Sequence, residues 1–597
     1  MLTGAWGARA GELLEQAAER GGKRVHRAGA LAMVHPPELV DGNRCCWLFG
    51  EPEDRGALAA HFGFGVSCNL HDAFARALTE LGDAAYELLC GRFVVVAFDG
   101  KRNRCLVTRD QLGAQPLVHV RLGDGVLFAE HERDLLDLLP HTPSPDRLAL
   151  LQWIENGLTP TRHTLYEGVQ RLPAGHRLIL DGTHASVGRW WSLRYEGVER
   201  DSAGALAERL REAAFAATRR AVEGAQRPAV KLSGGLDSAC VAAGLAASGF
   251  VNGRASAIGA TFSGYPATDE SKLIEATARH VNLPLELVEF DPANSMLAPA
   301  LEHIVRWRLP PGTANLFLWR PLMARARELG VDLMLDGEGG DELFGLAPYL
   351  IADKLRTGRL RTAWSYTRGL PGIGHHPGNR LRLRALRHYG LRPLVPTTVL
   401  LRRERARAMS SGSIVPSADA LALIDLRTTS REDRRSGPRW WRLQAETLVD
   451  TRDLLDVGGL FRREAADEKI ERRHPFLYDL ELVEATLRLP PQLQLDPVRD
   501  RLLLREALTG LIPETVRTRH VKSYFNAPML AGIRADERGL IEPLRRTNAV
   551  VRAYVTQETL DREIGVPPDD RSMLAVGSLW RIAIANRWLE YQAGESS

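Results

Sequence analysis

The sequence predicts two domains: a strand-rich α+β domain, followed by an α/β domain whose parallel sheet is flanked by helices. Three observations predict this fold class. The chain is 597 residues long, which exceeds one ordinary domain. Up to about residue 200 it carries short strands separated by glycine turns, whereas from residue 229 strands alternate with helices. A polar segment, residues 196–204, separates domains that we place at residues 1–200 and 205–597.

The composition is ordinary for a soluble chain, with 44% apolar residues and a formal net charge of +4. No apolar run approaches the length of a membrane-spanning helix, and the first residues lack the basic region and apolar core of a signal peptide. The six cysteines include no CxxC pair, so neither a zinc site nor a disulfide framework is indicated. We therefore expect a cytoplasmic protein with free thiols.

The elements of the first domain are read from apolar runs and from the turns that end them. Asp99-Gly100 is a hairpin signal, and Pro140 and Gly157 end helices. The predicted strands are residues 93–98, 105–108, 117–120 and 126–128, residues 172–180 are predicted to form a turn and a strand, and the predicted helices are residues 135–139 and 145–156.

A glycine turn between an apolar strand and the apolar helix of residues 240–247 is the centre of the second domain. It reads Lys231-Leu-Ser-Gly-Gly-Leu-Asp-Ser-Ala239. Its two glycines let backbone N–H groups converge on anionic oxygens at a helix N-terminus, and Ser233 and Ser238 add hydroxyl donors. Asp237 would repel phosphate unless a divalent cation lay between them. The turn predicts a pyrophosphate site with magnesium; an ordinary capped β–α turn is the alternative.

A second acidic glycine turn follows a later strand. Helices are expected at residues 206–222 and 269–281, and strands at residues 255–262, 285–290 and 331–335. The last strand leads into Asp336-Gly-Glu-Gly-Gly-Asp-Glu-Leu-Phe-Gly345. Because ligands bind at the carboxyl ends of parallel strands, both turns can face one ligand. The alternative is an acidic loop in which Asp341 and Glu342 favour a helix N-terminus.

Together the two turns resemble the SGGLDS and GEGxDELFG motifs of the asparagine synthetase family. The resemblance implies a C-terminal ATP-pyrophosphatase-type domain that uses ATP and Mg²⁺, with Asp237 and Asp341 as metal ligands. It places Glu338 at the reacting centre, as a base or as the group that orients the attacking amine. It also implies contacts to ATP or pyrophosphate from Leu232, Ser233, Gly234, Gly235, Asp237, Ser238, Phe262 and Gly337.

The last block of the chain carries three further phrases of this family. Residues 473–479 resemble its RxPFLD segment, residues 504–508 its LREA helix, and residues 519–525 its R-x-K-x-x-F loop with one extra residue before the lysine. The resemblance assigns to Lys522 the neutralisation of charge on the adenylate or pyrophosphate; a solvated loop lysine is the alternative. Other nearby carboxylates are expected only to cap or cover helices, namely Asp269, Glu270, Glu464, Glu468 and Glu471.

The first domain resembles the glutamine amidotransferase domain of the same family, an Ntn-type sandwich. Residues 109–117 resemble its RDxxGxxPL segment, residues 172–176 its LPPGH turn, and residues 189–191 its RYW phrase. The nucleophile in that domain is a cysteine at position 2, whose own amine serves as the base. Here Leu2 stands at that position and the first cysteine is Cys45. We therefore expect a domain that is retained as structure without glutaminase activity.

One segment indicates the kind of substrate. Residues 353–407 carry fourteen Lys and Arg against two Asp and Glu, interleaved with Trp364, Tyr366 and Tyr389. This pattern is compatible with a groove for a peptide that bears an acidic acceptor. The ordinary alternative is a solvated helical face. A nucleic-acid-binding surface is less well supported, because the chain is nearly neutral. Three arginines beside Trp440-Trp441 suit the same role or a helix with buried tryptophans; they are Arg434, Arg435 and Arg439.

The sequence therefore predicts ATP-dependent amide formation through an acyl-adenylate, in a chain most like a lasso peptide cyclase, or macrolactam synthetase. Such an enzyme joins an Asp or Glu side chain of a precursor peptide to the peptide's N-terminal amine and releases AMP and pyrophosphate. The expected partners are the precursor peptide, a leader-binding recognition protein and a leader peptidase, without nucleic acid or membrane. The alternatives are an ammonia-dependent asparagine synthetase, a β-lactam synthetase acting on a small β-amino acid, and a non-catalytic scaffold.

Overall fold

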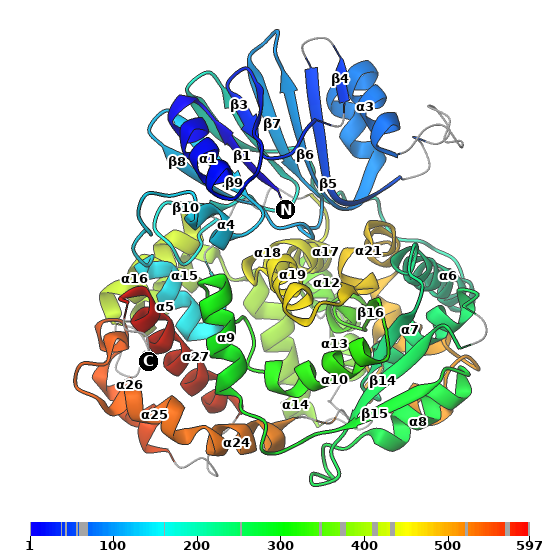
Figure 1. Ribbon diagram of the computed structural model, residues 1–597. Helices are drawn as coiled ribbons and strands as arrows, with labels where there is room; N and C mark the ends of the chain where they lie inside the picture. The colour runs from blue at the N-terminus through cyan, green and yellow to red at the C-terminus, as the bar shows by residue number, and fades with distance from the viewer. Residues whose placement is uncertain are drawn as a thin grey trace.

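A computed structural model describes residues 2–37, 39–41, 44–54, 58, 70–159, 162–250, 253–345, 349–370, 378–408, 416–429, 436–519, 523, 525–566 and 573–594. A pair of β-sheets forms one end of the molecule and rests on a larger domain of helices around a third sheet (Figure 1). Within this part of the chain, no helix has the length and apolarity to cross a membrane.

The N-terminal domain is a sandwich of two antiparallel sheets. The first sheet has the order β10 (Val169–Arg171), β8 (Val118–Leu122), β9 (Gly125–Ala129), β1 (Thr3–Trp6), β3 (Leu31–Met33) and β2 (His26–Ala28). The second has the order β12 (His184–Arg189), β11 (His176–Asp181), β7 (Arg104–Arg109), β6 (Leu89–Asp99), β5 (Arg44–Asp54) and β4 (Leu39–Asp41). Trp6, Trp47 and Phe128 are buried between them. Helices α1 (Ala8–Arg20) and α3 (Leu70–Leu81) lie on the outer faces (Figure 1).

The predicted hairpin is confirmed, since β6 and β7 pair with Phe98 opposite Cys105. The first predicted helix begins earlier than expected: α4 spans Glu132–Leu136. Its first turn contains Glu132 and Asp134, whose negative charge favours a helix N-terminus. The second, α5 (Arg147–Asn156), is capped by Asp146 and ends at Gly157 with φ +78°, as its sequence predicted.

The C-terminal domain contains the predicted parallel sheet flanked by helices. Its order is β15 (Leu285–Glu289), β14 (Ser256–Thr261), β13 (Pro228–Leu232), β16 (Leu333–Leu335) and β17 (Glu471–Arg473). Ala229 and Met334 pack on one face, Val230 and Leu335 on the other. The sheet is therefore buried on both sides, as expected of an α/β domain.

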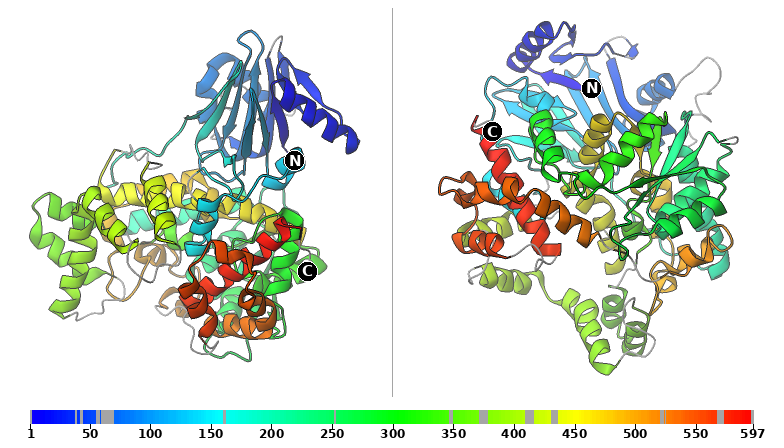
Figure 2. Two further views of the ribbon diagram at one scale, coloured as in Figure 1. Left: turned by 90° about the vertical axis from the view of Figure 1, so that its left-hand side faces the viewer. Right: turned by 60° about the horizontal axis from the view of Figure 1, so that its bottom comes forward.

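The domain contains further helices, of which α7 (Leu236–Ala247), α8 (Ser271–His280), α10 (Leu316–Glu328) and α19 (Val457–Glu468) pack on this sheet. The further helices are α6 (Ala203–Ala221), α7 (Leu236–Ala247), α8 (Ser271–His280), α9 (Leu297–Trp307), α10 (Leu316–Glu328), α11 (Gly340–Leu343), α12 (Leu350–Arg356), α13 (Leu360–Tyr366), α14 (Asn379–Ala385), α15 (Thr397–Ala408), α16 (Ser417–Thr429), α17 (Arg439–Ala445), α18 (Arg452–Leu454), α19 (Val457–Glu468), α20 (Pro475–Tyr478), α21 (Leu480–Leu487), α22 (Leu502–Ala507), α23 (Glu514–Arg517), α24 (Asn526–Ala535), α25 (Glu537–Arg545), α26 (Gln557–Gly565) and α27 (Met573–Gln592). The light-green helices of residues 350–394 project from the body of this domain (Figure 2).

The tryptophan pair settles one open alternative. Trp440 and Trp441 are buried in α17, and the Trp441 ring contacts Tyr195. This is the helix with buried tryptophans, so the pair itself presents no surface to a peptide. Arg439, at the start of the helix, is held by its backbone N–H, which donates to Asp353. Arg434 and Arg435 lie outside the described residues.

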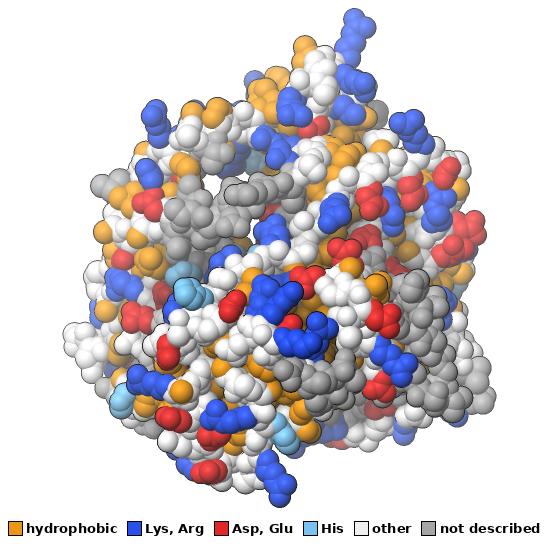
Figure 3. All heavy atoms as spheres, turned by 90° about the horizontal axis from the view of Figure 1, so that it is seen from above, with side chains coloured by type: hydrophobic (Ala, Val, Ile, Leu, Met, Phe, Trp, Pro, Cys, Tyr) orange, Lys and Arg blue, Asp and Glu red, His pale blue; other side chains and the backbone are white. Residues whose placement is uncertain are grey.

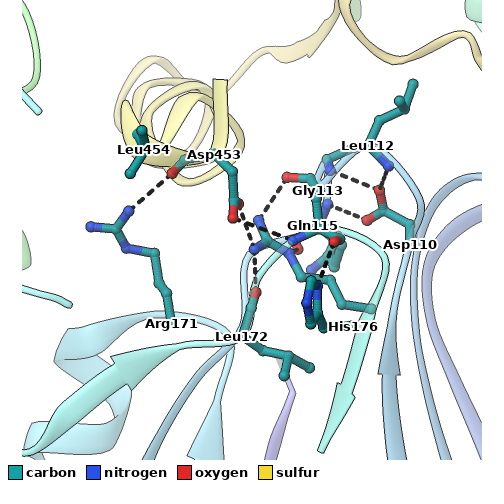
Figure 4. Close-up of polar contacts among 12 residues, drawn as sticks. Asp110, Leu112, Gly113, Gln115, Arg171, Leu172, His176, Asp453 and Leu454 are labelled. Carbon is teal, nitrogen blue, oxygen red and sulfur yellow. Dashed lines mark hydrogen bonds and ion pairs between the residues drawn. The ribbon is translucent and has the colours of Figure 1, made fainter. Parts of the chain in front are cut away.

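A buried polar cluster joins the two domains. The Arg109 guanidinium, 1% exposed, donates to backbone oxygens of its own domain and pairs with Asp453 of α18 at 2.9 Å. Arg171 donates to the Asp453 carbonyl at 3.1 Å. Figure 4 shows Asp453 and Leu454 facing the loop that contains Gly113. The RDxxGxxPL segment of the sequence therefore docks the domains together.

Candidate active site

The first glycine turn begins where β13 ends. Gly234 has φ +72°, a conformation that favours glycine, and α7 starts at Leu236. The Ser233 N–H donates to the Ser238 hydroxyl at 3.2 Å, and the two hydroxyl oxygens are also 3.2 Å apart. Serine hydroxyls and a helix N-terminus thus converge on one side of the turn, the arrangement predicted for an anion.

The second turn packs directly on the first. A Cβ atom at Gly337 would lie 2.6 Å from the Ser238 backbone nitrogen, and one at Gly340 would lie 2.4 Å from the Asp237 Cγ. These distances admit only glycine, because real Cβ contacts are longer. The two motifs, a hundred residues apart in the sequence, therefore form one site at adjacent strand ends, with β13 paired to β16.

One arginine connects the two predicted metal ligands. Arg501 Nη1 contacts Asp237 Oδ2 and lies 2.9 Å from Asp341 Oδ1. Both carboxylates thus reach the position of a single cation, so this donor set fits a divalent metal. Groups of three metal-ligating side chains are absent from the described residues, and further ligands would come from phosphate and water, as Mg²⁺ prefers. To bind there, the metal would have to displace Arg501.

Glu338 lies at the open side of the site, with its side chain 52% exposed. Its carboxylate Oε1 is 3.6 Å from Lys231 Nζ, and its backbone N–H donates to Asp336 Oδ1 at 3.1 Å. Lys231 is also 3.6 Å from Asp336 Oδ2, and its ammonium lies over the Trp319 ring, 5.1 Å from the centroid. Glu338 is therefore accessible to a substrate but anchored at both ends.

Asp336 is the buried anion at the base of this arrangement. His474 Nδ1 hydrogen-bonds its carboxylate at 2.8 Å, and Arg472 approaches it at 3.5 Å. Burial alone would raise the pKa of Asp336, but the surrounding positive charge, His474 foremost, outweighs burial and holds that pKa below its ordinary value. Asp336 is therefore a permanent negative charge under the second turn.

The residues that flank Lys522 contact the first turn, although Lys522 itself lies outside the described residues. Arg519 pairs with Glu270 at 2.5 Å and donates to the Gly234 carbonyl at 3.4 Å. The Ser523 backbone N–H donates to Glu270 at 3.3 Å. Glu270 thus binds the loop to the turn, and it is more than the helix cap that its sequence suggested.

Two other predicted contacts lie at strand ends. Leu232 and Phe262 are each 3% exposed, and the Phe262 ring packs against Phe290 and Phe525. The Phe262 backbone N–H donates to Asp269 at 2.8 Å. Any ligand contact by these two residues would therefore come from the backbone.

The expectation for Glu464 and Glu468 was wrong. They are 6% and 8% exposed, because Arg472 pairs with Glu464 and lies 3.5 Å from Glu468. Sequence reasoning also passed over Lys231, His474 and Arg501. Each stands in or next to a motif, and the signal that could have found Lys231 is its charge within an otherwise apolar strand.

These features define the class: an amidotransferase-like sandwich joined to an α/β domain whose two glycine turns form one site. The family follows from comparison with known proteins. A family model described as asparagine synthase matches residues 209–590, and one described as a glutamine amidotransferase domain matches residues 72–191. The chain belongs to the asparagine synthase family.

Similar proteins are distant in sequence. Glutamine-hydrolyzing asparagine synthetase 2 of Bacillus subtilis (strain 168) is 25% identical over 458 residues, which is 72% of this chain and 55% of that protein. Glutamine-hydrolyzing asparagine synthetase 3 of the same organism is 23% identical over 73% of this chain and 67% of that one. The chain thus spans about half the length of the first relative. The B. subtilis glutamine phosphoribosylpyrophosphate amidotransferase structure is 10% identical, covers 48% of this chain and 80% of its own, and has a TM-score of 0.23.

Proposed function

We propose that this chain forms an amide bond within a peptide at the expense of ATP, by ring closure of a lasso-type precursor. One observation carries the catalytic part of the proposal: Asp237 and Asp341 converge on one cation position, and Glu338 is exposed on the adjoining turn. A carboxylate to be activated and an amine to attack it can both reach this site.

The proposed reaction has two steps. A carboxylate oxygen of an Asp or Glu side chain attacks the α-phosphorus of ATP, and pyrophosphate leaves into the turn that Ser233 and Ser238 line. Mg²⁺ held by Asp237 and Asp341 would shield the triphosphate charge and polarise the phosphoryl group. The N-terminal amine then attacks the acyl carbon and AMP leaves. Glu338 orients this amine and accepts its proton.

The described cysteines support an amine that does not come from glutamine. Cys46, Cys90, Cys105 and Cys240 are buried, and Cys45 is half-buried. Burial raises the pKa of the Cys45, Cys105 and Cys240 thiols, which keeps them in the unreactive thiol form. In the part of the chain that the structure describes, no cysteine has the environment of a glutaminase nucleophile.

The charge distribution supports a peptide substrate. Residues 353–407 hold fourteen of the 78 Lys and Arg but only two of the 74 Asp and Glu, so the rest of the chain has a net charge of −8. On the end of the molecule formed by the N-terminal domain, by contrast, both signs are interspersed (Figure 3). Eleven arginines of residues 353–407 are exposed, and among the described residues an ion pair is formed only by the last of them: Arg356, Arg359, Arg361, Arg368, Arg380, Arg384, Arg387, Arg392, Arg402, Arg403 and Arg405.

Exposed leucines lie among these arginines. Leu360, Leu381, Leu383 and Leu391 each expose more than half of their surface. Exposed leucines are not expected on a surface that binds nucleic acid. A peptide with acidic and apolar side chains can contact both the arginines and the leucines. The aromatic residues of the segment serve internal packing: the Arg382 guanidinium stacks on Trp364 at 3.8 Å. We therefore assign peptide binding to the arginines and leucines, which we call the Arg/Leu surface.

The proposal is tested with a synthetic peptide that has an N-terminal glycine and an Asp or Glu several residues later. Incubation with Mg²⁺ and ATP should release AMP and pyrophosphate and yield a product lighter by one water. A triple variant, R380E/R384E/R387E, should raise the KM for the peptide while the kcat stays within about twofold, since surface charge acts mainly on association. Charge reversal at Arg209, which lies outside this surface, is the control.

Two rival substrates are tested in the same assay. The chain is similar to asparagine synthetases, so aspartate with ammonium replaces the peptide in one arm, and a small β-amino acid replaces it in another. Asparagine or β-lactam formed faster than the peptide product would refute ring closure while leaving ATP-dependent amide formation in place. Pyrophosphate release from none of the three would refute both and favour a non-catalytic scaffold.

A further inference from the structure

Lys231 is a buried ammonium group for which the reaction just described has no role. It is the fourth residue of β13, and the residue as a whole is 7% exposed. Its two charge partners are Asp336 and Glu338, each at 3.6 Å, and Trp319 closes the site from a third direction. The strand is otherwise apolar or proline, so the lysine stands where an aliphatic side chain would pack.

Burial makes this lysine informative. Removing an ammonium group from water is costly unless it is paired, and lysine is rarely found fully buried. Asp336 does not require Lys231, because His474 at 2.8 Å and Arg472 at 3.5 Å already face it. Glu338 is the partner that lacks another cation nearby among the described ion pairs.

We propose that Lys231 is a positioning residue for Glu338, whose carboxylate it holds in place and directs at the attacking amine. This inference rests on the proposed function, because the role of Glu338 does. The backbone N–H of Glu338 is tied to Asp336, and its carboxylate to Lys231. The backbone and the side chain of Glu338 are thus held by the buried pair of Asp336 and Lys231. The Trp319 ring restricts the positions that the lysine ammonium can take.

The predicted consequence is confined to the amide-forming step. Without Lys231, the Glu338 carboxylate loses the ammonium group 3.6 Å away that fixes its direction, so the attacking amine is held less well. Adenylation uses the phosphate turn and depends little on this pair. Other charged groups surround the pair and remain in a Lys231 variant; they are Asp336, Arg472, His474, Glu464, Glu468 and Arg320.

The experiment compares K231M with K231R, using whichever carboxylate substrate supports pyrophosphate release in the wild type. We expect ATP–pyrophosphate exchange in K231M to stay within threefold. Amide formation should fall at least tenfold. K231R should recover most of the rate. K101M, which removes an exposed lysine from a turn, is the control.

An equal loss in both steps would overturn the proposal, because a structural defect has that signature. A second measurement needs no substrate: K231M, E338Q and the double variant are compared by thermal unfolding. If Lys231 and Glu338 interact, the decrease in Tm of the double variant should be smaller than the sum of the decreases in the two single variants. Additive decreases would refute the pairing. If the wild type releases no pyrophosphate, the proposed function fails. The comparison of the single and double variants by thermal unfolding still decides whether Lys231 and Glu338 interact.

Discussion

Two buried arginine–carboxylate clusters of this molecule resemble each other in burial and charge but differ in their other contacts. Arg109, between the domains, and Arg501, in the candidate site, are 1% and 8% exposed. Arg109 donates to three backbone carbonyls as well as to Asp453. The Arg501 guanidinium, by contrast, pairs with carboxylates, those of Asp237, Asp341 and Asp500, and the last two have half-exposed side chains.

The difference shows how one kind of ion pair serves two purposes. Moving Arg109 would leave buried carbonyl oxygens without donors, which costs about 1–3 kcal/mol each. Moving Arg501 leaves carboxylates that another cation can satisfy. The interdomain cluster is therefore a fixed joint, whereas the cluster of Arg501 can exchange its cation for a ligand.

Breaking the fixed joint should have the largest effect. D453N removes the charge that faces Arg109 but keeps the shape of the side chain. We expect the free energy of unfolding to fall by about 3–5 kcal/mol, because a buried guanidinium is left without its counterion. Chemical denaturation followed by circular dichroism measures this loss.

The matched control is D201N, which removes a carboxylate 2.7 Å from the exposed Arg209. An exposed pair of this kind contributes about 0–1 kcal/mol, so D201N should be close to the wild type. Equal losses in D453N and D201N would show that the interdomain cluster is no more than a surface contact.

Changing the exchangeable cluster should leave the fold intact and weaken ligand binding. D341N removes one of the two carboxylates that converge on the cation position. We expect the affinity for Mg²⁺–ATP to fall about 10- to 100-fold, the usual cost of disturbing a metal's ligand environment. Isothermal titration calorimetry with Mg²⁺ and ATP reports this loss without turnover. An unchanged affinity would place the metal elsewhere.

The strong motifs allowed much of this site to be predicted from the sequence. The alternation of strands and helices predicted the parallel sheet, and the two glycine turns do lie in contact. Turn chemistry is local, so it can be read from a few adjacent residues. The predicted roles of Glu338, Asp237 and Asp341 stay predictions that the experiments above address.

What the sequence did not predict depends on contacts that the local sequence pattern does not specify. Arg501 meets Asp237 across 264 positions, and His474 meets Asp336 across 138. Glu464 and Glu468 have the sequence of a helix surface, and only the placement of Arg472 on β17 explains their burial. Arg501 and His474 could not be assigned from sequence because their partners are distant in the chain. Glu464 and Glu468 have their partner within eight positions, but it lies on a strand whose placement the helical pattern does not give.

A third arginine, Arg472, is intermediate between the fixed cluster of Arg109 and the exchangeable cluster of Arg501. We expect its smaller effect to appear as a pH dependence of the free energy of unfolding. Burial raises the pKa of Glu468 to about 7, and the nearby charge of Arg472 only partly offsets it. The folded state therefore holds a proton that the unfolded chain releases near its ordinary pKa of 4.5. Stability is then lost as the pH rises from about 4.5 to 7, and it changes little above that.

The variant E468Q removes this pH dependence of the stability. Its stability relative to the wild type should rise across the same window by at most about 3 kcal/mol, measured as denaturation midpoints at pH 5 and pH 8. Taking this difference cancels other groups that titrate there, such as Glu53, and E208Q, an exposed glutamate on α6, should show no such change. A constant difference between E468Q and the wild type would mean that Glu468 is ionised throughout, and that the charge of Arg472 outweighs the burial of this carboxylate.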